Sequence, residues 1–279
     1  MLGKLVLTGA AGRLGSYLRE PLTQLCAELV STDIAEDIGT LYPGESYQQA
    51  DLAQMEQIAP VLAGAEMVVH FGAIVDEKPF EDLLGPNFVG SYNVWEAGYK
   101  AGARRIVYAS SIHAVGMHLK SDFIGIDAEH RPDTFYGLAK CFTEDLGRMY
   151  WDKRGLESVH LRILSCAQVN NTRALGSWLS YDDLIHLVTR AIDTPSVGFG
   201  IVYGVSNNDR APVDNTKASF LGYRPRDNAE IYAADLLGNE GPLDTSDPGQ
   251  MCHGGPFAKV DLGQSGLAQM NVVDDTKKT

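Results

Sequence analysis

Short, largely apolar runs alternate with longer amphipathic segments over residues 4–164 of the chain. Such runs are typical of strands that are buried on both faces of a sheet. They lie at residues 4–7, 28–32, 67–71, 105–109 and 158–164. In the segments between them apolar residues recur every three or four positions, which predicts helices. These segments lie at residues 12–25, 54–62, 87–101 and 134–150, and a weaker strand precedes Asp51.

This alternation predicts an α/β fold. Parallel strands joined by right-handed helical crossovers form a doubly wound sheet, so we expect a Rossmann-type domain over residues 1–166. After Cys166 the alternation breaks, with one more helix at residues 181–192 and one more strand at residues 201–205. The end of the chain is rich in Gly, Pro and Asp. We therefore expect residues 167–279 to form a small region that caps a substrate pocket, with a flexible extreme C-terminus.

A glycine-rich motif, GAAGRLG, stands between the first predicted strand and the first predicted helix. In this context Gly9 allows a tight turn, Gly12 lets the backbone approach a pyrophosphate, and Gly15 lets the helix press against the strand. The free N–H groups of the helix N-terminus then face the anion. The alternative is an ordinary glycine-rich turn, but the position of the motif favours a dinucleotide site.

An acidic residue at the end of the second predicted strand specifies which dinucleotide is expected. Asp33 follows Gly15 by 33 − 15 = 18 positions, close to the spacing of about 20 at which a carboxylate binds the adenosine ribose hydroxyls. This carboxylate would repel a 2′-phosphate, so it favours NAD over NADP, although Arg13 could meet such a phosphate. Asp51 and Leu52 could hold the adenine edge, or Asp51 could be a helix N-cap.

A Tyr-xxx-Lys pair, Tyr136 and Lys140, lies in the predicted helix at residues 134–150. Residues four apart share a helix face, so the Lys140 ammonium could lower the pKa of Tyr136 toward neutrality and make it a general base. Ser110 and Ser111 end the strand RIVYAS, and Ser111 could polarise the substrate oxygen. The pair alone could be a surface contact, but its order after the glycine motif and Asp33 favours hydride-transfer chemistry with NAD.

Composition excludes several other classes. With 23 Lys and Arg against 36 Asp and Glu, the net charge is −13, and no basic cluster offers the surface that nucleic acid needs. The acidity favours solubility or a saline habitat. The cysteines, Cys26, Cys141, Cys166 and Cys252, lack the spacing of metal ligands or a disulfide framework, as is typical of the reducing cytoplasm. No apolar stretch reaches the roughly 18 residues of a membrane span, so we expect a cytoplasmic protein without a membrane or metal site.

The motifs together resemble the extended short-chain dehydrogenase/reductase superfamily of NAD-dependent epimerases and dehydratases. Within it, the chain is similar to bacterial uronate dehydrogenases. The similarity is carried by TGAAGRLG, VVHFGA, EKPFEDLL, YGLAKCFTEDLGRMYWDK, LRILSC, NNTRALGSWLSYDDL, VYGVSNN and FLGYRPRDNAE. It implies oxidation of C1 of a cyclic hexuronate (glucuronate or galacturonate) with NAD, giving an aldarolactone. It also implies a homo-oligomer, either a dimer or a hexamer.

The resemblance extends the predicted site. Tyr136, Lys140 and Ser111 would be catalytic, and Arg173 would pair with the substrate carboxylate, as a guanidinium does through two parallel hydrogen bonds. The alternatives are a solvated loop residue for Arg173, a structural role for His113 and simple packing for Cys166. The predicted cofactor site comprises Gly9, Gly12, Arg13, Leu14, Gly15, Asp33, Ile34, Asp51, Leu52, Phe71, Gly72, Ala73, Asn87, Lys140 and Cys166. The predicted substrate site comprises Val75, Ser111, Ile112, His113, Tyr136, Ser165 and Arg173.

The chain also departs from these dehydrogenases. Val75 replaces a usual Ser, Ile112 replaces a usual Asn, and the loop before Arg173 is one residue shorter. Lost hydrogen-bond partners for a sugar hydroxyl change discrimination strongly, so another acidic, sulfonated, deoxygenated or neutral aldose stays open as substrate. A sugar-nucleotide epimerase or dehydratase would need a larger C-terminal region. A non-catalytic NAD-sensing protein would lose Tyr136 or Lys140, and this chain keeps both.

Overall fold

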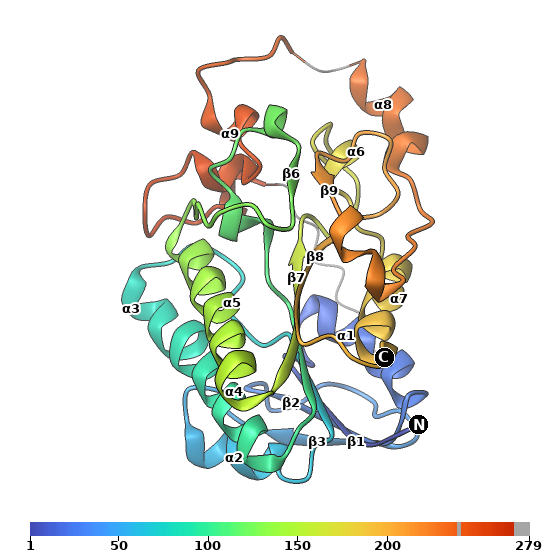
Figure 1. Ribbon diagram of the computed structural model, residues 1–279. Helices are drawn as coiled ribbons and strands as arrows, with labels where there is room; N and C mark the ends of the chain where they lie inside the picture. The colour runs from blue at the N-terminus through green and yellow to red at the C-terminus, as the bar shows by residue number, and fades with distance from the viewer. Residues whose placement is uncertain (239–240, 271–279) are drawn as a thin grey trace.

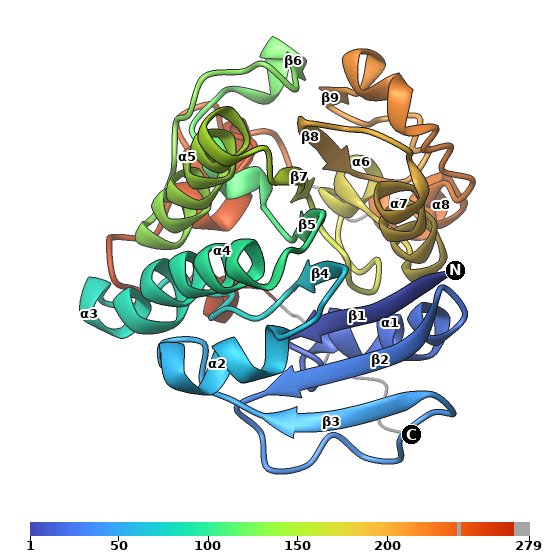
Figure 2. The ribbon, with the colours of Figure 1, turned by 60° about the horizontal axis from the view of Figure 1, so that its bottom comes forward.

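A computed structural model describes residues 1–238 and 241–270 of the chain. Its centre is a seven-stranded parallel sheet in the order β3-β2-β1-β4-β5-β7-β8. The strands are β1 (Leu2–Thr8), β2 (Cys26–Asp33), β3 (Glu45–Gln49), β4 (Met67–His70), β5 (Arg105–Tyr108), β7 (Glu157–Ile163) and β8 (Phe199–Gly204) (Figures 1 and 2). The order reverses beside β1, so the predicted doubly wound, Rossmann-type sheet is confirmed.

Helices cover both faces of the sheet because residues along each strand alternate in direction. In β1, Leu5 and Leu7 pack on the face covered by α1 (Arg13–Thr23) and α7 (Tyr181–Asp193). Val6 between them packs on the opposite face. That face is covered by α2 (Met55–Leu62), α4 (Gly90–Ala101) and α5 (Phe135–Arg154), as Figure 2 shows.

Helix α5 is longer than the sequence pattern predicts. The Thr134 hydroxyl accepts a hydrogen bond from the Gly137 N–H and caps the N-terminus of the helix. The helix continues past Tyr150 to Arg154, because no residue there breaks it, and it ends where Gly155 adopts a left-handed conformation with φ 68°. The start of α5 therefore holds Tyr136 and Lys140 rigidly at the carboxyl end of the sheet.

The helix predicted at residues 87–101 has an unexpected beginning. A short helix, α3 (Phe80–Leu83), leads into a π-helical turn, Leu84–Val89, which continues as α4. A π-turn inserts an extra residue into the helix, and such turns are frequent at functional sites. The π-turn places Asn87, whose amide binds both backbone groups of Ile74 at 2.9 Å. The loop after β4 is thereby fixed.

Beyond Cys166 the predicted helix and strand are present as α7 and β8, and β8 joins the central sheet beside β7. The remaining elements are short and carry no sequence periodicity. They include α6 (Ala174–Ser177), α8 (Ala233–Leu237), α9 (Pro248–Met251) and β9 (Val213–Asp214), which pairs with β6 (Ile124–Gly125) from an earlier part of the chain. The predicted flexible C-terminus falls on residues 271–279, which lie outside the described residues.

Residues 252–270, which we name the strap, cross the carboxyl end of the sheet beside α3 and α5 (Figure 1). Two buried carboxylates of the loop after β4 hold the strap. Asp76 accepts hydrogen bonds from the Ser265 hydroxyl at 2.5 Å and from the Gly266 N–H at 2.9 Å. Glu77 accepts from the Gly263 N–H and from the Tyr136 N–H, both at 2.8 Å. The strap is thus tied to the first turn of α5.

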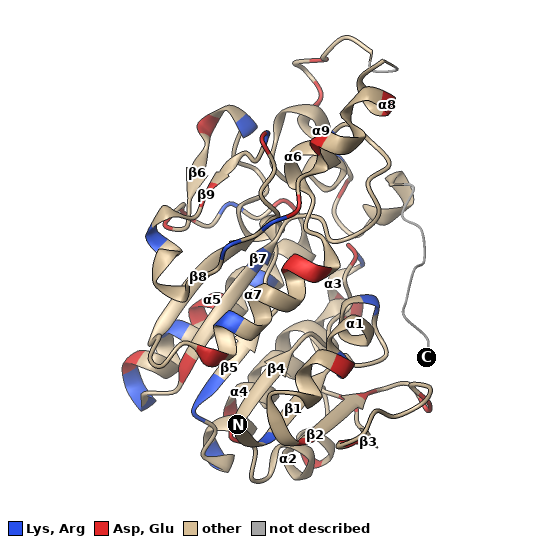
Figure 3. Ribbon diagram, turned by 90° about the vertical axis from the view of Figure 1, so that its right-hand side faces the viewer, with Lys and Arg blue, Asp and Glu red and all other residues tan. Residues whose placement is uncertain are grey.

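The distribution of charged residues and the hydropathy of the helices bear on nucleic-acid binding and membrane insertion. In the view of Figure 3, Lys and Arg positions alternate with Asp and Glu positions and do not form one basic face. Among the described helices, none combines the length and the apolar character needed to cross a bilayer.

Candidate active site

A cavity of about 780 Å³ opens at the carboxyl end of the central sheet. The loops that follow β1, β2, β3, β4, β5 and β7 all contribute to its wall, together with α5 and the strap. In doubly wound sheets ligands bind at this edge, beside the point where the strand order reverses. The volume lies within the roughly 300–1,000 Å³ of small-molecule pockets. The fold therefore offers one continuous site for a dinucleotide and a second small ligand.

The three motif glycines are required for different reasons. Gly9 has φ 74°, and a Cβ there would lie 2.5 Å from the Gly72 nitrogen. A Cβ on Gly15 would lie 2.0 Å from the Gly9 carbonyl oxygen. A Cβ on Gly12 would meet, within 4 Å and among the described residues, the Gly9 carbonyl oxygen alone, at 3.2 Å. The fold thus needs Gly9 and Gly15, whereas Gly12 is restricted only by the Gly9 carbonyl oxygen and fits the close approach of a ligand.

The N-terminus of α1 faces the same space. Within the described residues no side chain caps it, and Gly12 is its N-cap. Uncapped N–H groups and the positive end of the helix dipole favour a phosphate group. The residues present therefore fit the diphosphate of a dinucleotide.

The end of β2 lies at the adenosine side of this space. The Asp33 carboxylate accepts hydrogen bonds from the N–H groups of Ala11 at 3.0 Å and Ala35 at 3.3 Å, so it is fixed at the cavity wall. Asp51 also lines the cavity and accepts a hydrogen bond from the Ala53 N–H. The N-cap of α2 is Gln54, so the alternative that Asp51 caps this helix is wrong.

Tyr136, Lys140 and Ser111 meet at the centre of the cavity. Tyr136 and Ser111 both line the cavity, and Ser111 lies close enough to the phenol to lower its pKa against the effect of burial. The Lys140 ammonium donates to the Ala109 carbonyl oxygen at 2.8 Å and lies 5.2 Å from the centre of the Tyr136 ring and 4.7 Å from that of Tyr108. All three side chains of the predicted catalytic group are nearly buried. The structure therefore brings them together on one wall, as the spacing predicts.

Burial dominates the protonation of this group. Desolvation lowers the pKa of Lys140 to about 7, and the Glu144 carboxylate acts in the opposite direction. Desolvation raises the pKa of Tyr136, and the nearby Ser111 opposes that rise. The expectation that Lys140 brings the pKa of Tyr136 toward neutrality is therefore not met in the protein by itself. Burial of Lys140 weakens its ability to stay protonated. Tyr136 therefore needs additional nearby positive charge in order to ionise to a phenolate.

His113 lies beside Tyr136 with its ring held on two sides. Its Nδ1 binds the buried Asp133 carboxylate at 2.7 Å, and its ring stacks on Phe257 of the strap with centroids 4.1 Å apart. The bond to Asp133 fixes the ring orientation. A Cβ on Gly254 of the strap would lie 1.9 Å from an Asp133 oxygen, so the strap can pass here only with glycine. His113 thus lines the cavity in a defined position.

Arg173 supplies a guanidinium to the substrate end of the cavity. Its Nη2 donates to the His253 carbonyl oxygen at 3.0 Å, and its Nε has no hydrogen-bond partner among the described residues although it is buried. Burial lowers the pKa of Arg173, and Asp133 raises it. A buried donor without a partner is costly, and a ligand carboxylate would satisfy it. The alternative of a solvated loop residue does not fit this burial.

Two predicted residues are not brought into the cavity wall. Asn87 is buried behind it and binds the backbone of Ile74. Ile112 is fully buried in a separate apolar cluster with Val115 and Leu164, so its side chain replaces no pocket polar group. The other predicted residues line the cavity, namely Gly9, Gly12, Arg13, Leu14, Gly15, Asp33, Ile34, Asp51, Leu52, Phe71, Gly72, Ala73, Val75, Ser111, His113, Tyr136, Lys140, Ser165, Cys166 and Arg173.

Sequence reasoning missed the part of the wall that the strap supplies. Phe257, Leu267 and Met270 line the substrate end, and Gly254 lies beside them. Val75, which is 57% exposed, belongs to the same apolar side of the cavity. The strap has no periodic pattern, so the sequence contains no signal that pairs Phe257 with His113.

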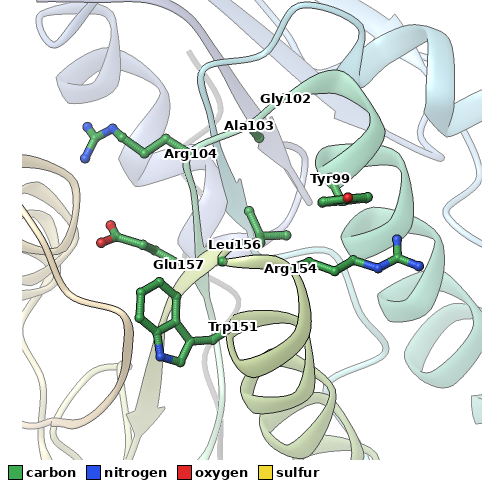
Figure 4. A pocket seen from close by; sticks show the side chains of 9 residues that line it. Tyr99, Gly102, Ala103, Arg104, Trp151, Arg154, Leu156 and Glu157 are labelled. Carbon is green, nitrogen blue, oxygen red and sulfur yellow. The ribbon is translucent and has the colours of Figure 1, made fainter.

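A second hollow, of about 320 Å³, lies at the opposite edge of the sheet between the ends of α4 and α5 (Figure 4). Its charged groups already have partners. Glu157 pairs with the buried Arg105, and Arg154 donates to Glu96 at 2.9 Å. The hollow is remote from the glycine motif and from Tyr136. The catalytic chemistry therefore belongs to the larger cavity.

Comparison with known proteins agrees with this site. Residues 5–167 match the model of the NAD dependent epimerase/dehydratase family. The chain belongs to this family. It is 41% identical to a uronate dehydrogenase of Pseudomonas putida over 91% of this chain and 95% of that protein.

Solved structures give the same grouping. The chain is 37% identical to glucuronic acid dehydrogenase from Chromohalobacter salexigens, with a TM-score of 0.90 over 94% of this chain and 98% of that one. It is 38% identical to a variant of uronate dehydrogenase from Agrobacterium tumefaciens complexed with NAD, with a TM-score of 0.88 and the same coverage. The resemblance to uronate dehydrogenases and NAD as the cofactor are confirmed. The chain is an NAD-dependent oxidoreductase of this group.

Proposed function

We propose that this protein oxidises the anomeric C1 hydroxyl of a cyclic hexuronate, glucuronate or galacturonate, to an aldarolactone. The observation that carries the proposal is the half-buried Arg173 side chain, whose buried Nε lacks a partner among the described residues, in the same cavity as Tyr136 and Lys140. A guanidinium binds a carboxylate through parallel hydrogen bonds, so an acidic sugar would be held at a fixed position relative to the phenol. The uronate dehydrogenases to which the chain is similar support this substrate class.

The proton of the C1 hydroxyl would pass to Tyr136. Ser111, which lines the cavity beside the phenol, would hold the substrate oxygen while the carbonyl forms. Lys140 would stabilise the phenolate by its charge, since its ammonium lies beside the Tyr136 ring. NAD bound along Gly12 and Asp33 supplies the acceptor for the C1 hydride. The balanced products are the lactone, NADH and one proton.

The sugar ring would lie between polar and apolar walls. Asp133 holds the His113 ring in an orientation that lets it form a hydrogen bond with a sugar hydroxyl. Val75, Phe257 and Leu267 present apolar surface on the strap side. Arg173 favours an anionic substrate, carboxylated or sulfonated, over a neutral aldose. The exposed Val75 favours a sugar with one less hydroxyl on that side as the second candidate.

Initial rates of NADH formation with a substrate panel test the proposal. The panel contains glucuronate, galacturonate, their deoxygenated and sulfonated counterparts, glucose and a nucleotide sugar, each with NAD and with NADP. We expect turnover of the uronates with NAD and rates roughly 10- to 150-fold lower with glucose, because a lost charge-assisted contact costs roughly 1.5–3 kcal/mol. Tight NAD binding without turnover of any sugar would reject the proposal.

The organisation of the chain enters the proposal as well. We propose residues 1–166 as the NAD-binding domain and residues 167–279 as the region that completes the substrate end, since β7 ends at Ile163 and Arg173 follows it. A cytoplasmic location and a dimer or hexamer also stay predictions. Light scattering of the purified chain would decide the oligomer size.

A further inference from the structure

A buried carboxylate, Glu144, lies behind the catalytic wall and has no part in the mechanism given above. Its side chain is 1% exposed. Arg162 of β7 donates to it through Nε at 3.0 Å and Nη2 at 2.7 Å. The Ser110 hydroxyl donates to Oε1 at 2.6 Å, and His130 binds Oε2 at 2.8 Å. Burial alone would raise its pKa, but the bonds from His130 and Arg162 lower it to about 2, so Glu144 is ionised.

The position of Glu144 links both halves of the catalytic group. It follows Lys140 by one turn of α5 on the same face of the helix. Its partner Ser110 immediately precedes Ser111 at the end of β5. One carboxylate therefore connects the strand end that carries Ser111 with the helix that carries Tyr136 and Lys140.

Glu144 is the carboxylate one helical turn from Lys140, and its charge favours the protonated form of the ammonium from a distance. The groups that face the ammonium are His70 from β4, Tyr108 from β5, and Tyr136 and Glu144 from α5. Burial lowers the pKa of His70 to about 3, so this ring is neutral. Burial also raises the pKa of Tyr108, so its phenol is neutral. Among the described residues, Glu144 is thus the negative charge that acts on Lys140.

The groups around Glu144 modulate this charge. Arg162 and His160 approach it from β7, His130 from the loop before α5, and Asp145 is the next residue on α5. Burial lowers the pKa of His160 to about 4. Arg162 neutralises part of the Glu144 charge, and the remaining effect of Glu144 on Lys140 is to raise its pKa against the lowering by burial.

We infer that Glu144 is a positioning residue for the dehydrogenase reaction: its carboxylate ties Ser110 to α5, and its negative charge keeps the Lys140 ammonium protonated in the cavity wall. The inference rests on the proposed function for its kinetic consequence. For the state of Lys140 it rests on the position of Glu144, one helical turn away on α5, and on the sign of its charge. A protonated Lys140 supplies the positive charge that the buried Tyr136 phenol needs in order to release its proton.

The sign of the expected effect follows from the charge. Without the Glu144 charge the protonated form of Lys140 loses a favourable interaction, so its pKa falls further below the ordinary value. Lys140 then becomes neutral at a lower pH. The alkaline limb of the kcat/KM profile moves to lower pH, because turnover is lost where the ammonium is lost.

The test is Glu144→Gln, which keeps the size of the side chain and removes its charge. Reaction of Lys140 with cyanate, read by mass spectrometry of the peptide, measures the neutral amine over a pH series without any substrate. We expect its midpoint to fall by about one pH unit or more, the alkaline limb to move with it, and the affinity for NAD to change less than about threefold. Because labelling needs no sugar, a wrong substrate proposal leaves this readout intact.

Matched variants separate charge from structure. Glu157→Gln removes the carboxylate of another buried pair with an arginine, Arg105, at the opposite edge of the sheet, and should lower thermal stability without moving the midpoint. Glu144→Asp keeps the charge and should restore the midpoint. If Glu144→Gln fails to fold because Arg162 is left unpaired, the double variant E144Q/R162Q removes both charges. Its midpoint should fall by less than that of Glu144→Gln, because the lost positive charge acts in the opposite direction. A folded variant without Glu144 whose Lys140 midpoint matches the wild type overturns the inference.

Discussion

The two ends of the cavity are built in different ways. At the cofactor end, one contiguous loop between β1 and α1 supplies backbone groups, and Gly9 and Gly15 are required because other backbone atoms leave no room for a Cβ. At the substrate end, His113, Arg173 and Phe257 come from distant parts of the chain. Buried carboxylates hold His113 and the strap. The bond from Gly266 to Asp76, for example, spans 190 positions.

This difference assigns different physical tasks to the two ends. The cofactor end is determined by local backbone geometry, so it tolerates changes in the rest of the wall. The substrate end depends on hydrogen bonds between remote segments, so its shape responds to single side chains. Variants of the substrate end should therefore change turnover and KM for the sugar while leaving the affinity for NAD nearly constant.

The largest expected effect is that of Tyr136→Phe. Removal of the phenol oxygen abolishes the general base, so kcat should fall by roughly 10³-fold or more. NAD affinity, measured by fluorescence titration, should stay within about threefold because the cofactor end is untouched. Tyr150→Phe is the matched control on the same helix, since its hydroxyl donates to Glu96 outside the cavity. Equal loss of activity in both variants would contradict a catalytic role for Tyr136.

The same contrast explains how much the sequence could predict. The glycine motif, Asp33, Tyr136 and Lys140 lie at fixed spacings inside regular elements, so strand ends and helix faces place them correctly. The extension of α5 to Arg154 could not be seen, because the helix ends at a glycine conformation and not at a change in periodicity.

The substrate end shows where prediction fails. Ile112 was expected in the pocket from its place in the motif, but the chain turns at Ser111 and buries Ile112 in the apolar cluster around Leu164. The stacking of Phe257 on His113 depends on a strap without periodicity. Its position is decided by tertiary hydrogen bonds to Asp76 and Glu77, which leave no pattern along the chain.

Arg173→Gln should give the second largest effect. The amide keeps one donor but loses the charge, so KM for a uronate should rise roughly 10- to 100-fold. The ratio of kcat/KM for glucuronate to that for glucose should fall by the same factor, because glucose never used the charge. Arg210→Gln, at a surface pair with Glu230, is the control. An unchanged ratio would show that another group recognises the carboxylate.

Two glycine variants sharpen the comparison within the cofactor end. Gly15→Ala should destabilise the fold by about 1–3 kcal/mol, because its Cβ would lie 2.0 Å from the Gly9 carbonyl oxygen. Gly12 has ordinary backbone angles, φ −68° and ψ 162°, which an alanine can also adopt. The unfolding temperature of Gly12→Ala should therefore shift little, while its affinity for NAD should fall. Thermal scans with and without NAD distinguish the two. Equal destabilisation by both would mean that Gly12 also serves packing.

The smallest expected effect comes from loosening the strap. Asp76 accepts hydrogen bonds from Ser265, Gly266 and Leu267, so Asp76→Ala leaves these donors without their acceptor. We expect KM for the sugar to rise a few-fold, roughly as for one lost buried hydrogen bond of about 1 kcal/mol. Amide hydrogen exchange in residues 252–270 should become faster.

The control for the strap is Asp261→Ala, within the strap itself. Its carboxylate accepts a hydrogen bond from the adjacent Leu262 N–H at 2.9 Å, so its loss should leave KM unchanged. If Asp76→Ala weakened NAD and sugar equally, the two ends of the cavity would be coupled through the loop after β4. The contrast between a locally determined cofactor end and a strap-dependent substrate end would then be wrong, because Phe71 and Gly72 of that loop also line the cofactor side of the cavity.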